Sequence, residues 1–160
     1  MEIRTATIHD LDAVTALEAV CFPPAEAASR ESFQTRLAAF GDHFWLMFDG
    51  EMLVSMVNGM VTDLPDLIDE MYHDAGMHDP KGRWQMIFGV DTHPDYQRRG
   101  FAERVLNRAI SDAREQGRAG LVLTCKDALV HYYAKFGFED EGVSDSTHGG
   151  VVWHQMRLTF

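Results

Sequence analysis

The sequence predicts a single domain, residues 1–160, of the α/β (α+β) class with a mixed sheet. A length of 160 residues suits one domain of ordinary size, and no internal repeat, low-complexity tract or Pro/Ser-rich linker divides it. Hydrophobic residues make up 46% and charged residues 24%, a globular balance that excludes wholesale disorder. In the second half, apolar runs alternate with helical patterns, which is typical of strands packed against helices.

The N-terminal part predicts a short strand followed by two helices. Residues 3–6 are the candidate strand. Residues 11–21 place apolar side chains at helical spacing behind Asp10, a residue type that caps helix N-termini. Pro23 ends this helix, because proline lacks a backbone donor and restricts the residue before it. Ser29 then caps a second helix with apolar residues on one face.

A hairpin and an acidic segment follow. The apolar runs 44–48 and 52–61 are separated by Asp49-Gly50-Glu51, and Asp-Gly between two such runs is a strong hairpin signal. Residues 62–80 combine apolar side chains at helical spacing with acidic residues and contain no Lys or Arg. These residues predict a helix. Its acidic side either faces solvent or attracts a cationic ligand.

Strands and helices alternate in the second half of the chain. Gly137 ends the predicted helix 128–135, as glycine often does. The predicted strands are 84–90, 121–125 and a pair at 138–143 and 151–158, and the predicted helices are 100–116 and 128–135.

Charge and composition exclude several classes of function. The net charge is 14 − 25 = −11 at pH 7, which argues against binding to nucleic acid or docking on anionic lipid. No apolar stretch approaches the roughly 18 residues of a membrane span, and the N-terminus has no signal core. We therefore expect a cytoplasmic protein with no membrane partner and with reduced thiols at Cys21 and Cys125. We expect no metal, because the histidines and aspartates at 73–79 match no closed site.

Residues 90–102, VDTHPDYQRRGFA, concentrate the chemical information. A predicted strand ends, a proline-containing loop turns, and the pattern Gln97-x-x-Gly100-x-Ala102 opens a helix. The first turn of a helix has free backbone N–H groups and a partial positive charge of about half an elementary unit. Gly100 permits close approach of a ligand to the backbone, and Ala102 keeps the next contact small.

The same stretch is locally basic in an acidic chain. Three arginines against one glutamate leave a charge of +2 between Tyr96 and Arg104. This combination of charge and free N–H groups indicates a site for a pyrophosphate. The stretch is not a P-loop, because no Gly-Lys-Ser/Thr follows, and it lacks the three-glycine dinucleotide fingerprint.

A second pattern lies downstream. The apolar strand 121–125 leads into a short helix containing Tyr132 and Tyr133, and Phe136-Gly137-Phe138 follows. Taken alone, it indicates aromatic side chains packed around a turn glycine.

Together, these two patterns resemble the GNAT superfamily of acyl-CoA-dependent N-acetyltransferases. The family's phosphate-binding signature, Gln/Arg-x-x-Gly-x-Gly/Ala, corresponds to residues 97–102, and its Tyr-x-x-x-Gly-Phe element corresponds to residues 133–138. Within the superfamily, residues 127–130, the His78-Asp79-Pro80 turn and Cys21-Phe22-Pro23 are similar to arylalkylamine (serotonin-type) N-acetyltransferases and their bacterial relatives.

The resemblance implies a twisted, mostly antiparallel sheet that is splayed at its centre, with helices on both faces and acetyl-CoA as cosubstrate at the splay. It implies that backbone groups of Phe88 and Val90 hold the pantetheine and the thioester. The backbone amides that would hold the pyrophosphate are those of Arg98, Arg99, Gly100, Phe101, Ala102 and Glu103.

The resemblance also places Tyr133 near the thioester sulfur, as the catalytic residue. A phenol of pKa about 10 stays protonated at neutral pH and can donate to a forming thiolate of pKa about 8.5. A backbone N–H near Phe88 suits the oxyanion.

The chain differs from the arylalkylamine subfamily in the residues that would accept the proton of the amine. That subfamily places two histidines on the central strand, whereas the matching positions here are Trp84 and Met86, neither of which is a base. The proton acceptor is therefore either a water chain or one of the side chains His73, His78, His131 and Glu70.

The expected function is transfer of an acetyl group from acetyl-CoA to a primary amine of a small molecule, by a monomer or homodimer. The candidates for the amine pocket are Phe22, Pro23, Trp84 and Met86. Two alternatives stay open, acetylation of a peptide or protein and non-catalytic binding of an acyl-CoA as a sensor.

Overall fold

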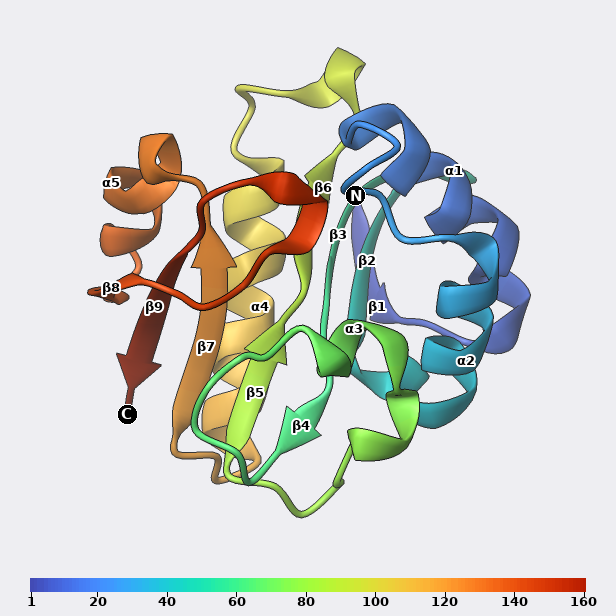
Figure 1. Ribbon diagram of the computed structural model, residues 1–160. Coiled ribbons are helices and arrows are strands. Elements are labelled where there is room, and N and C mark those ends of the chain that lie inside the picture. Colours follow the sequence, from blue (N-terminus) through green and yellow to red (C-terminus); the bar gives the residue numbers. More distant parts are fainter.

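The computed structural model describes all residues, 1–160, and contains two sheets that diverge from each other (Figure 1). One sheet has the strand order β1-β2-β3-β6 and the other has the order β4-β5-β7-β9-β8. All pairs are antiparallel except β5 with β7. The strands are β1 (Glu2–Thr5), β2 (Phe44–Asp49), β3 (Met52–Asn58), β4 (Val61–Thr62), β5 (Trp84–Ile87), β6 (Gly89–Thr92), β7 (Gly120–Cys125), β8 (Glu139–Val143) and β9 (His154–Thr159).

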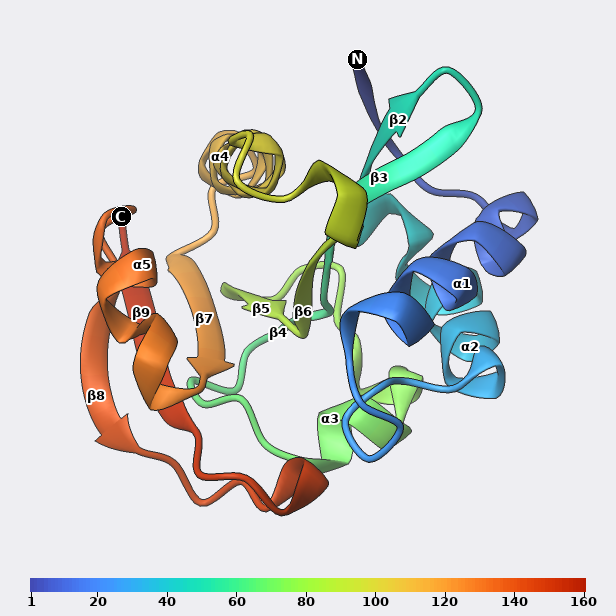
Figure 2. The ribbon, with the colours of Figure 1, turned by 90° about the horizontal axis from the view of Figure 1, so that it is seen from above.

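Helices cover both faces of the sheets (Figure 2). Helices α1 (Leu11–Cys21) and α2 (Arg30–Phe40) share one hydrophobic core with the inward side chains of β2 and β3. Helix α4 (Phe101–Glu115) and the short α5 (Val130–Ala134) pack into a second core on the opposite face. Because side chains alternate along a strand, neighbouring residues of β2 and β3 contribute to different cores. The predicted fold class, with helices on both faces of a mostly antiparallel splayed sheet, is confirmed.

The divergence of the sheets begins where two predicted strands each break in two. The predicted strand 84–90 divides at Phe88, so that β5 belongs to one sheet and β6 to the other. The run 52–61 divides beside it at Gly59, where a β-carbon would lie 1.9 Å from the Met86 carbonyl oxygen. Only glycine allows this close approach of the two backbones.

A buried glutamine satisfies the carbonyl groups that these breaks leave without strand partners. Gln85 Nε2 donates to the carbonyls of Gly59 and Met86, both at 2.8 Å. Its Oε1 lies 2.9 Å from His43 Nδ1. Gln85 thereby stabilises the point from which the two sheets separate, because buried backbone groups without partners are costly.

Several predicted boundaries are confirmed. Helix α1 ends at Cys21, directly before Phe22 and Pro23, and the Ser29 hydroxyl accepts a hydrogen bond from the Ser32 N–H at the start of α2. The hairpin at Asp49-Gly50 joins β2 to β3, with Gly50 in the left-handed region at φ +59°. Strands β8 and β9 pair as expected.

Two predicted local structures are wrong. Residues 62–80 form no single helix but one α-helical turn, α3 (Glu70–His73), followed by a 3-10 turn. Their apolar residues reach the core from irregular backbone, as the burial of Leu67 and Met71 shows. Asp10 does not cap α1; its carboxylate accepts from the Thr7 N–H at 2.8 Å and from Arg4. Asp10 therefore closes the 3-10 turn that precedes the helix.

Candidate active site

The separation of β6 from β7 creates the candidate site. The pairing of β5 with β7 ends at Ile87 and Leu123, so the last residues of β7 lack a strand partner on that side. Two pockets, of about 610 Å³ and 230 Å³, lie at this separation. Val90, Leu129 and Tyr133 line both pockets. A ligand that extends from one pocket into the other therefore passes these three residues.

The larger pocket is bounded by the loop and helix start that the sequence identified. Residues Gln97, Arg98, Gly100, Phe101, Ala102 and Glu103 line it. No backbone N–H from Gln97 to Glu103 donates a hydrogen bond within the protein, and the first helical bond runs from Arg104 N–H to the Gly100 carbonyl. Arg98 and Gly100 are both in the left-handed region, at φ +62° and +78°. Free N–H groups at a helix start are an anion-binding arrangement.

Arginine side chains add positive charge beside this loop. The Arg99 guanidinium carbon lies 5.3 Å from the ring centre of Tyr96 and 5.1 Å from that of Phe101. These cation–π contacts hold the charge next to the free N–H groups. The geometry fits a pyrophosphate at residues 98–103, and the binding assignment stays a prediction.

Strand β6 presents unpaired backbone groups to the separation. In an antiparallel pair, opposite residues alternate between those that exchange hydrogen bonds and those that do not. His93 N–H donates to the Val54 carbonyl at 2.8 Å, and Val57 lies opposite Val90, three positions along. The N–H and C=O of Val90 therefore point away from β3, toward the gap. This geometry suits a residue that holds an extended ligand, and the binding role of Val90 stays a prediction.

The backbone N–H of Phe88 is engaged within the protein. It donates to the Asn58 carbonyl at 2.7 Å, so this amide is not free to stabilise an oxyanion. The predicted oxyanion donor, a backbone N–H near Phe88, is therefore not the N–H of Phe88 itself. The Phe88 side chain instead lines the 230 Å³ pocket, while the nearest outward N–H on the strand belongs to Val90.

Tyr133 lies where the two pockets meet. It is buried on α5, within the core that also contains Phe138, and its hydroxyl forms no hydrogen bond within the protein. Burial, and next the neighbouring Tyr132, raises the pKa of Tyr133 above its usual value. The phenol is therefore protonated at neutral pH and available as a donor to a group in either pocket.

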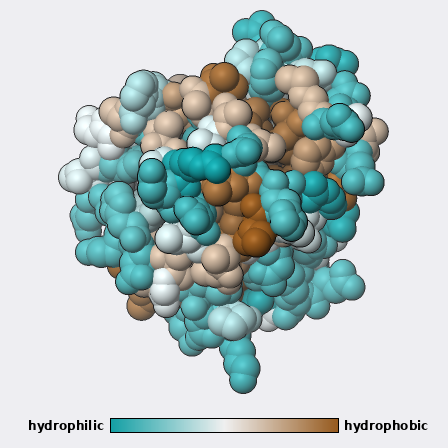
Figure 3. Space-filling view, turned by 90° about the vertical axis from the view of Figure 1, so that its right-hand side faces the viewer, coloured by the Kyte–Doolittle hydropathy of each residue, from teal (hydrophilic) through white to brown (hydrophobic).

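The smaller pocket has mainly apolar walls. Phe22 and Pro23, which follow α1, line it together with Phe88, Tyr133 and Trp153. It adjoins a third pocket of about 350 Å³, with which it shares Glu18, Glu26, Tyr72, Phe88 and His148. Figure 3, which views the molecule from the side of α1 and α2, shows apolar side chains gathered in the middle of this face with hydrophilic ones around them.

Other predicted site residues lie elsewhere. Met86 is fully buried in the α1–α2 core, and Trp84 packs under the Arg157 guanidinium at 4.5 Å, so neither lines these three pockets. Their prediction as amine-pocket residues is wrong, because their side chains point into the sheet packing rather than into the gap.

The four candidate bases are also dispersed. His78 packs between Phe40 and His43, with its Nδ1 accepting from the Val61 N–H. His131 and Glu70 are exposed and do not line the 230 Å³ pocket, and His73 lines only the 350 Å³ pocket. None of the four reaches Tyr133's pocket, which contradicts their prediction as general bases for a group bound there.

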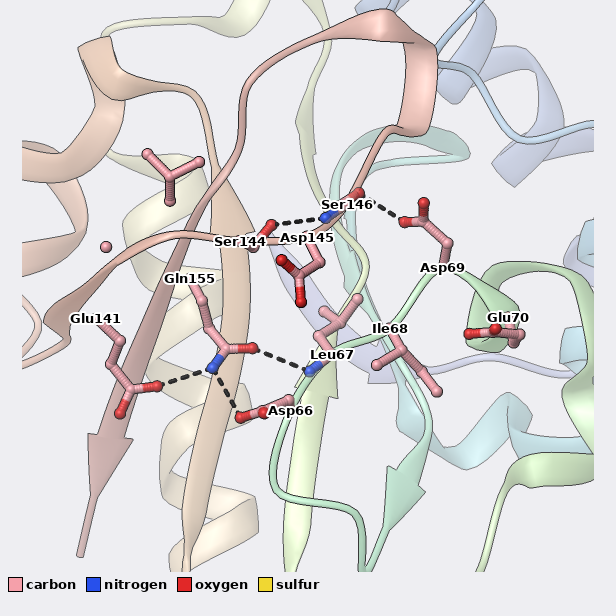
Figure 4. Close-up of a pocket in the computed structure, with 12 residues that line it drawn as sticks. Asp66, Leu67, Ile68, Asp69, Glu70, Glu141, Ser144, Asp145, Ser146 and Gln155 are labelled. Carbon is pink, nitrogen blue, oxygen red and sulfur yellow. Dashed lines mark hydrogen bonds between the residues drawn. The ribbon is translucent and has the colours of Figure 1, made fainter.

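The acidic segment 62–80 lines a separate pocket of about 470 Å³ (Figure 4). Its carboxylates are largely engaged within the protein. Asp69 accepts hydrogen bonds from the Ser146 hydroxyl at 2.6 Å and the Thr147 N–H at 3.0 Å, and Asp66 accepts from Gln155 Nε2 at 2.9 Å. Asp69 therefore anchors the loop that carries His148 and Trp153 to the smaller pocket.

Sequence reasoning missed two buried carboxyl groups at the site. Glu18, on α1, lines the 230 Å³ and 350 Å³ pockets, and Asp91, on β6, is fully buried beside it. The signal for Glu18 was present, because it lies at helical spacing among apolar residues 14, 17 and 21. An acidic residue on the apolar face of a helix is informative, because charged side chains are rarely buried. The sequence carries no comparable signal for His148.

The chain matches a known protein family over most of its length. A family model described as "Acetyltransferase (GNAT) family" matches residues 11–138, which include both motifs and every strand from β2 to β7. The chain belongs to the GNAT acetyltransferase family. The resemblance inferred from the two motifs is thereby confirmed.

Individual GNAT proteins show both the likeness and its extent. A serotonin N-acetyltransferase of Mesocricetus auratus is 28% identical over 113 residues, covering 70% of this chain and 53% of that protein. The chain thus matches about half the length of this relative. The structure of the GphF GNAT-like decarboxylase in complex with isobutyryl-CoA superimposes with a TM-score of 0.85 at 20% identity, covering 99% of both chains. The ribosomal-protein-S18-alanine N-acetyltransferase of Escherichia coli gives 0.73 at 18% identity, covering 99% of this chain and 92% of that one.

Two further observations describe the GNAT domain. No helix is both long and apolar enough to cross a membrane. No group of three or more His, Cys, Asp or Glu side chains has the arrangement needed to hold a metal ion.

Proposed function

We propose that this GNAT domain transfers an acetyl group from acetyl-CoA to a primary amine of a small molecule. The observation that carries the proposal is the meeting of two pockets at Val90, Leu129 and Tyr133. One pocket presents free backbone N–H groups for an anion, and the other is small and mainly apolar. This is the arrangement that a long phosphorylated thioester and a compact acceptor require.

Residues of the larger pocket bind and orient the cosubstrate. The N–H groups of 98–103 donate to the pyrophosphate, and Arg98 and Arg99 offset its charge. The outward C=O of Val90 binds the pantetheine arm, whose thioester then lies beside Tyr133. The Val90 N–H is the available donor for the oxyanion, in place of Phe88.

Tyr133 serves as the hydrogen-bond donor to the departing sulfur. Because burial raises the pKa of Tyr133, the phenol remains protonated and does not act as a base. Acid–base assistance of this kind typically contributes about 10²–10⁴ in rate.

The volume of the pocket beside Tyr133 supports a small amine as the acceptor. A volume of about 230 Å³ lies below the roughly 300–1,000 Å³ of pockets that hold drug-sized ligands. Phe22, Pro23 and Phe88 would contact its apolar part. The name of the serotonin N-acetyltransferase relative also supports an amine acceptor.

A panel of acceptors tests the proposal. Release of free thiol from acetyl-CoA is measured with small primary amines, with peptides and without acceptor, and coenzyme A binding is measured by calorimetry. Turnover on small amines is expected. Turnover on peptides alone would assign a peptide acetyltransferase, and binding of coenzyme A without any turnover would assign a sensor. A parallel series of acyl-CoAs of increasing chain length tests the preference for acetyl.

A further inference from the structure

Two buried carboxyl groups from different elements converge beside the acceptor pocket. A β-carbon placed on Gly89 would lie 3.1 Å from Asp91 Oδ1 and 3.9 Å from Glu18 Oε1. The same position would lie 3.7 Å from Asn58 Nδ2. Glu18 is 7% exposed and Asp91 is 0% exposed. Two ionised carboxylates this close and this buried would repel each other strongly.

The two oxygens of Glu18 have different surroundings. Oε2 accepts a hydrogen bond from the Ala28 N–H at 2.9 Å, which fixes the carboxylate against the loop after α1. Oε1 is buried and has no hydrogen-bond donor among the other groups of the protein. Glu18 lines both the 230 Å³ and the 350 Å³ pockets, so its side chain forms part of the wall that a group entering either pocket would meet.

The charges around the pair favour a single negative charge. Arg36, from α2, is buried, donates to the Tyr72 carbonyl at 3.1 Å and attracts both carboxyl groups. The other titratable groups that line the 230 Å³ pocket are Cys21, Glu26, Tyr72, Cys125, Lys126, Tyr133 and His148. The Glu26 charge is balanced by Lys126 at 2.8 Å. Burial, and next the charge of Glu18, raises the pKa of Asp91 well above its usual value.

We propose that Glu18 accepts the proton of the amine substrate and that Asp91, which keeps a proton of its own, positions the Glu18 carboxylate by donating a hydrogen bond to it. The proposal rests on the proposed function and assigns the base that the dispersed histidines do not supply. Glu18 is then a catalytic residue and Asp91 a positioning residue.

The proton balance is complete with these groups. The amine arrives as an ammonium ion and gives one proton to Glu18, which passes it to solvent after the reaction. The neutral nitrogen forms a bond to the thioester carbonyl carbon, and the carbon–sulfur bond then breaks. The second proton that the nitrogen loses replaces the one that Tyr133 donates to the thiolate. The products are the amide, the free thiol and one proton released to solvent.

Isosteric variants test the roles, with 2-phenylethylamine and acetyl-CoA as substrates. Glu18→Gln is expected to lower kcat by about 100-fold or more, while coenzyme A affinity by calorimetry stays within about twofold. Asp91→Asn keeps a donor toward Glu18 and is expected to retain kcat within about threefold. Glu31→Gln, at an exposed acid on α2, is the control and is expected to change neither.

The pH profile of kcat separates positioning by Asp91 from a structural role. Asp91→Val removes the donor to the Glu18 carboxylate, and the acid limb of kcat is expected to move to higher pH. Asp91→Asn leaves that limb in place. Wild-type kcat in Glu18→Gln would overturn the proposal, as would equal acid limbs in the Val and Asn variants.

A measurement without substrate tests whether Asp91 holds a proton. Infrared spectra of the wild-type protein at pH 7 are expected to show the carbonyl stretch of a buried protonated carboxyl group, and Asp91→Asn is expected to remove it. A spectrum without this band would overturn the proposal even if amines are acetylated. Conversely, a wild-type protein that binds coenzyme A, shows the band and acetylates no amine would contradict the proposed function instead.

Discussion

Lys126 Nζ lies 2.8 Å from Glu26 Oε1, an ion pair that joins the loop after α1 to the residue after β7. Both residues line the 230 Å³ pocket, and Lys126 also lies 6.0 Å from the ring centre of Trp153. Three segments far apart in the sequence thus meet at one wall of this pocket. Glu26 is almost fully buried, whereas Lys126 is half-exposed, so the lysine reaches inward to a carboxylate that solvent barely contacts.

Removal of this lysine should destabilise the protein. In Lys126→Gln the buried Glu26 carboxylate loses its partner, which costs about 1–3 kcal/mol, and each kcal/mol corresponds to roughly 2–4 °C in Tm for a chain of this size. Differential scanning calorimetry measures the change. Lys81→Gln removes the same charge from a side chain without an ion pair and should leave Tm unchanged. Equal Tm values for the two variants would contradict an energetic role for the pair.

Tyr133→Phe should lower kcat at least about tenfold without weakening acetyl-CoA binding. The hydroxyl forms no bond within the protein, so its loss removes only what it donates to a bound molecule. Stopped-flow thiol detection and calorimetry measure the two quantities. Tyr132→Phe is the matched control, since Tyr132 lines the larger pocket but not the smaller one. An unchanged kcat in Tyr133→Phe would remove this residue from the mechanism.

Ala102→Asp should separate the pyrophosphate site from the stability of α4. A carboxylate in the first helical turn stabilises the helix by about 0.3–1 kcal/mol, yet repels a phosphate bound to the same N–H groups. We expect coenzyme A affinity to fall about tenfold or more while Tm is unchanged or raised. Asn107→Asp introduces the same charge at an exposed position further along α4 and should leave affinity within about twofold. Undiminished binding by Ala102→Asp would place the pyrophosphate elsewhere.

The stability of the protein should fall below about pH 6.5 because of His43 and His78. Burial lowers the pKa of both imidazoles from the ordinary value of 6.5, and for His78 the neighbouring His43 lowers it further. The unfolded chain therefore binds protons that the folded protein does not, and ΔG of unfolding decreases as pH falls. Their ring centres lie 5.3 Å apart, so protonation of one disfavours protonation of the other.

Urea unfolding at pH 7.5 and pH 5.5 measures this dependence. The difference in ΔG between the two pH values should shrink in the double variant His43→Gln/His78→Gln. The exposed His9→Gln variant should show the wild-type difference. A double variant with the full wild-type difference would assign the acid sensitivity to other groups.

The glycine and proline signals predicted local structure well because they act through their own backbone. Asp49-Gly50 formed the hairpin, and the chain left its helix before Pro23. The acidic segment failed because its apolar spacing reflects contacts with distant residues. Leu67 N–H donates to Gln155, 88 residues away, and no periodicity within 62–80 encodes that partner.

The candidate site was predicted in part for the same reason. The N–H groups of 98–103 and the tyrosine of the second motif belong to continuous segments, so the sequence by itself determined which residues form a helix start with free N–H groups and which tyrosine lies beside the pockets. Membership of the GNAT family and the α/β class followed from those two motifs and the order of elements.

Only the tertiary structure decided the chemistry of the acceptor side. The break of two strands at Phe88 and Gly59 turns β6 away from β7, and this brings Glu18 of α1 beside Asp91 of β6 and moves Trp84 and Met86 out of reach. The physical reason is that the environment of these two carboxyl groups depends on burial and on the approach of charges from separate elements. Those quantities arise from packing, and no spacing along the chain contains them.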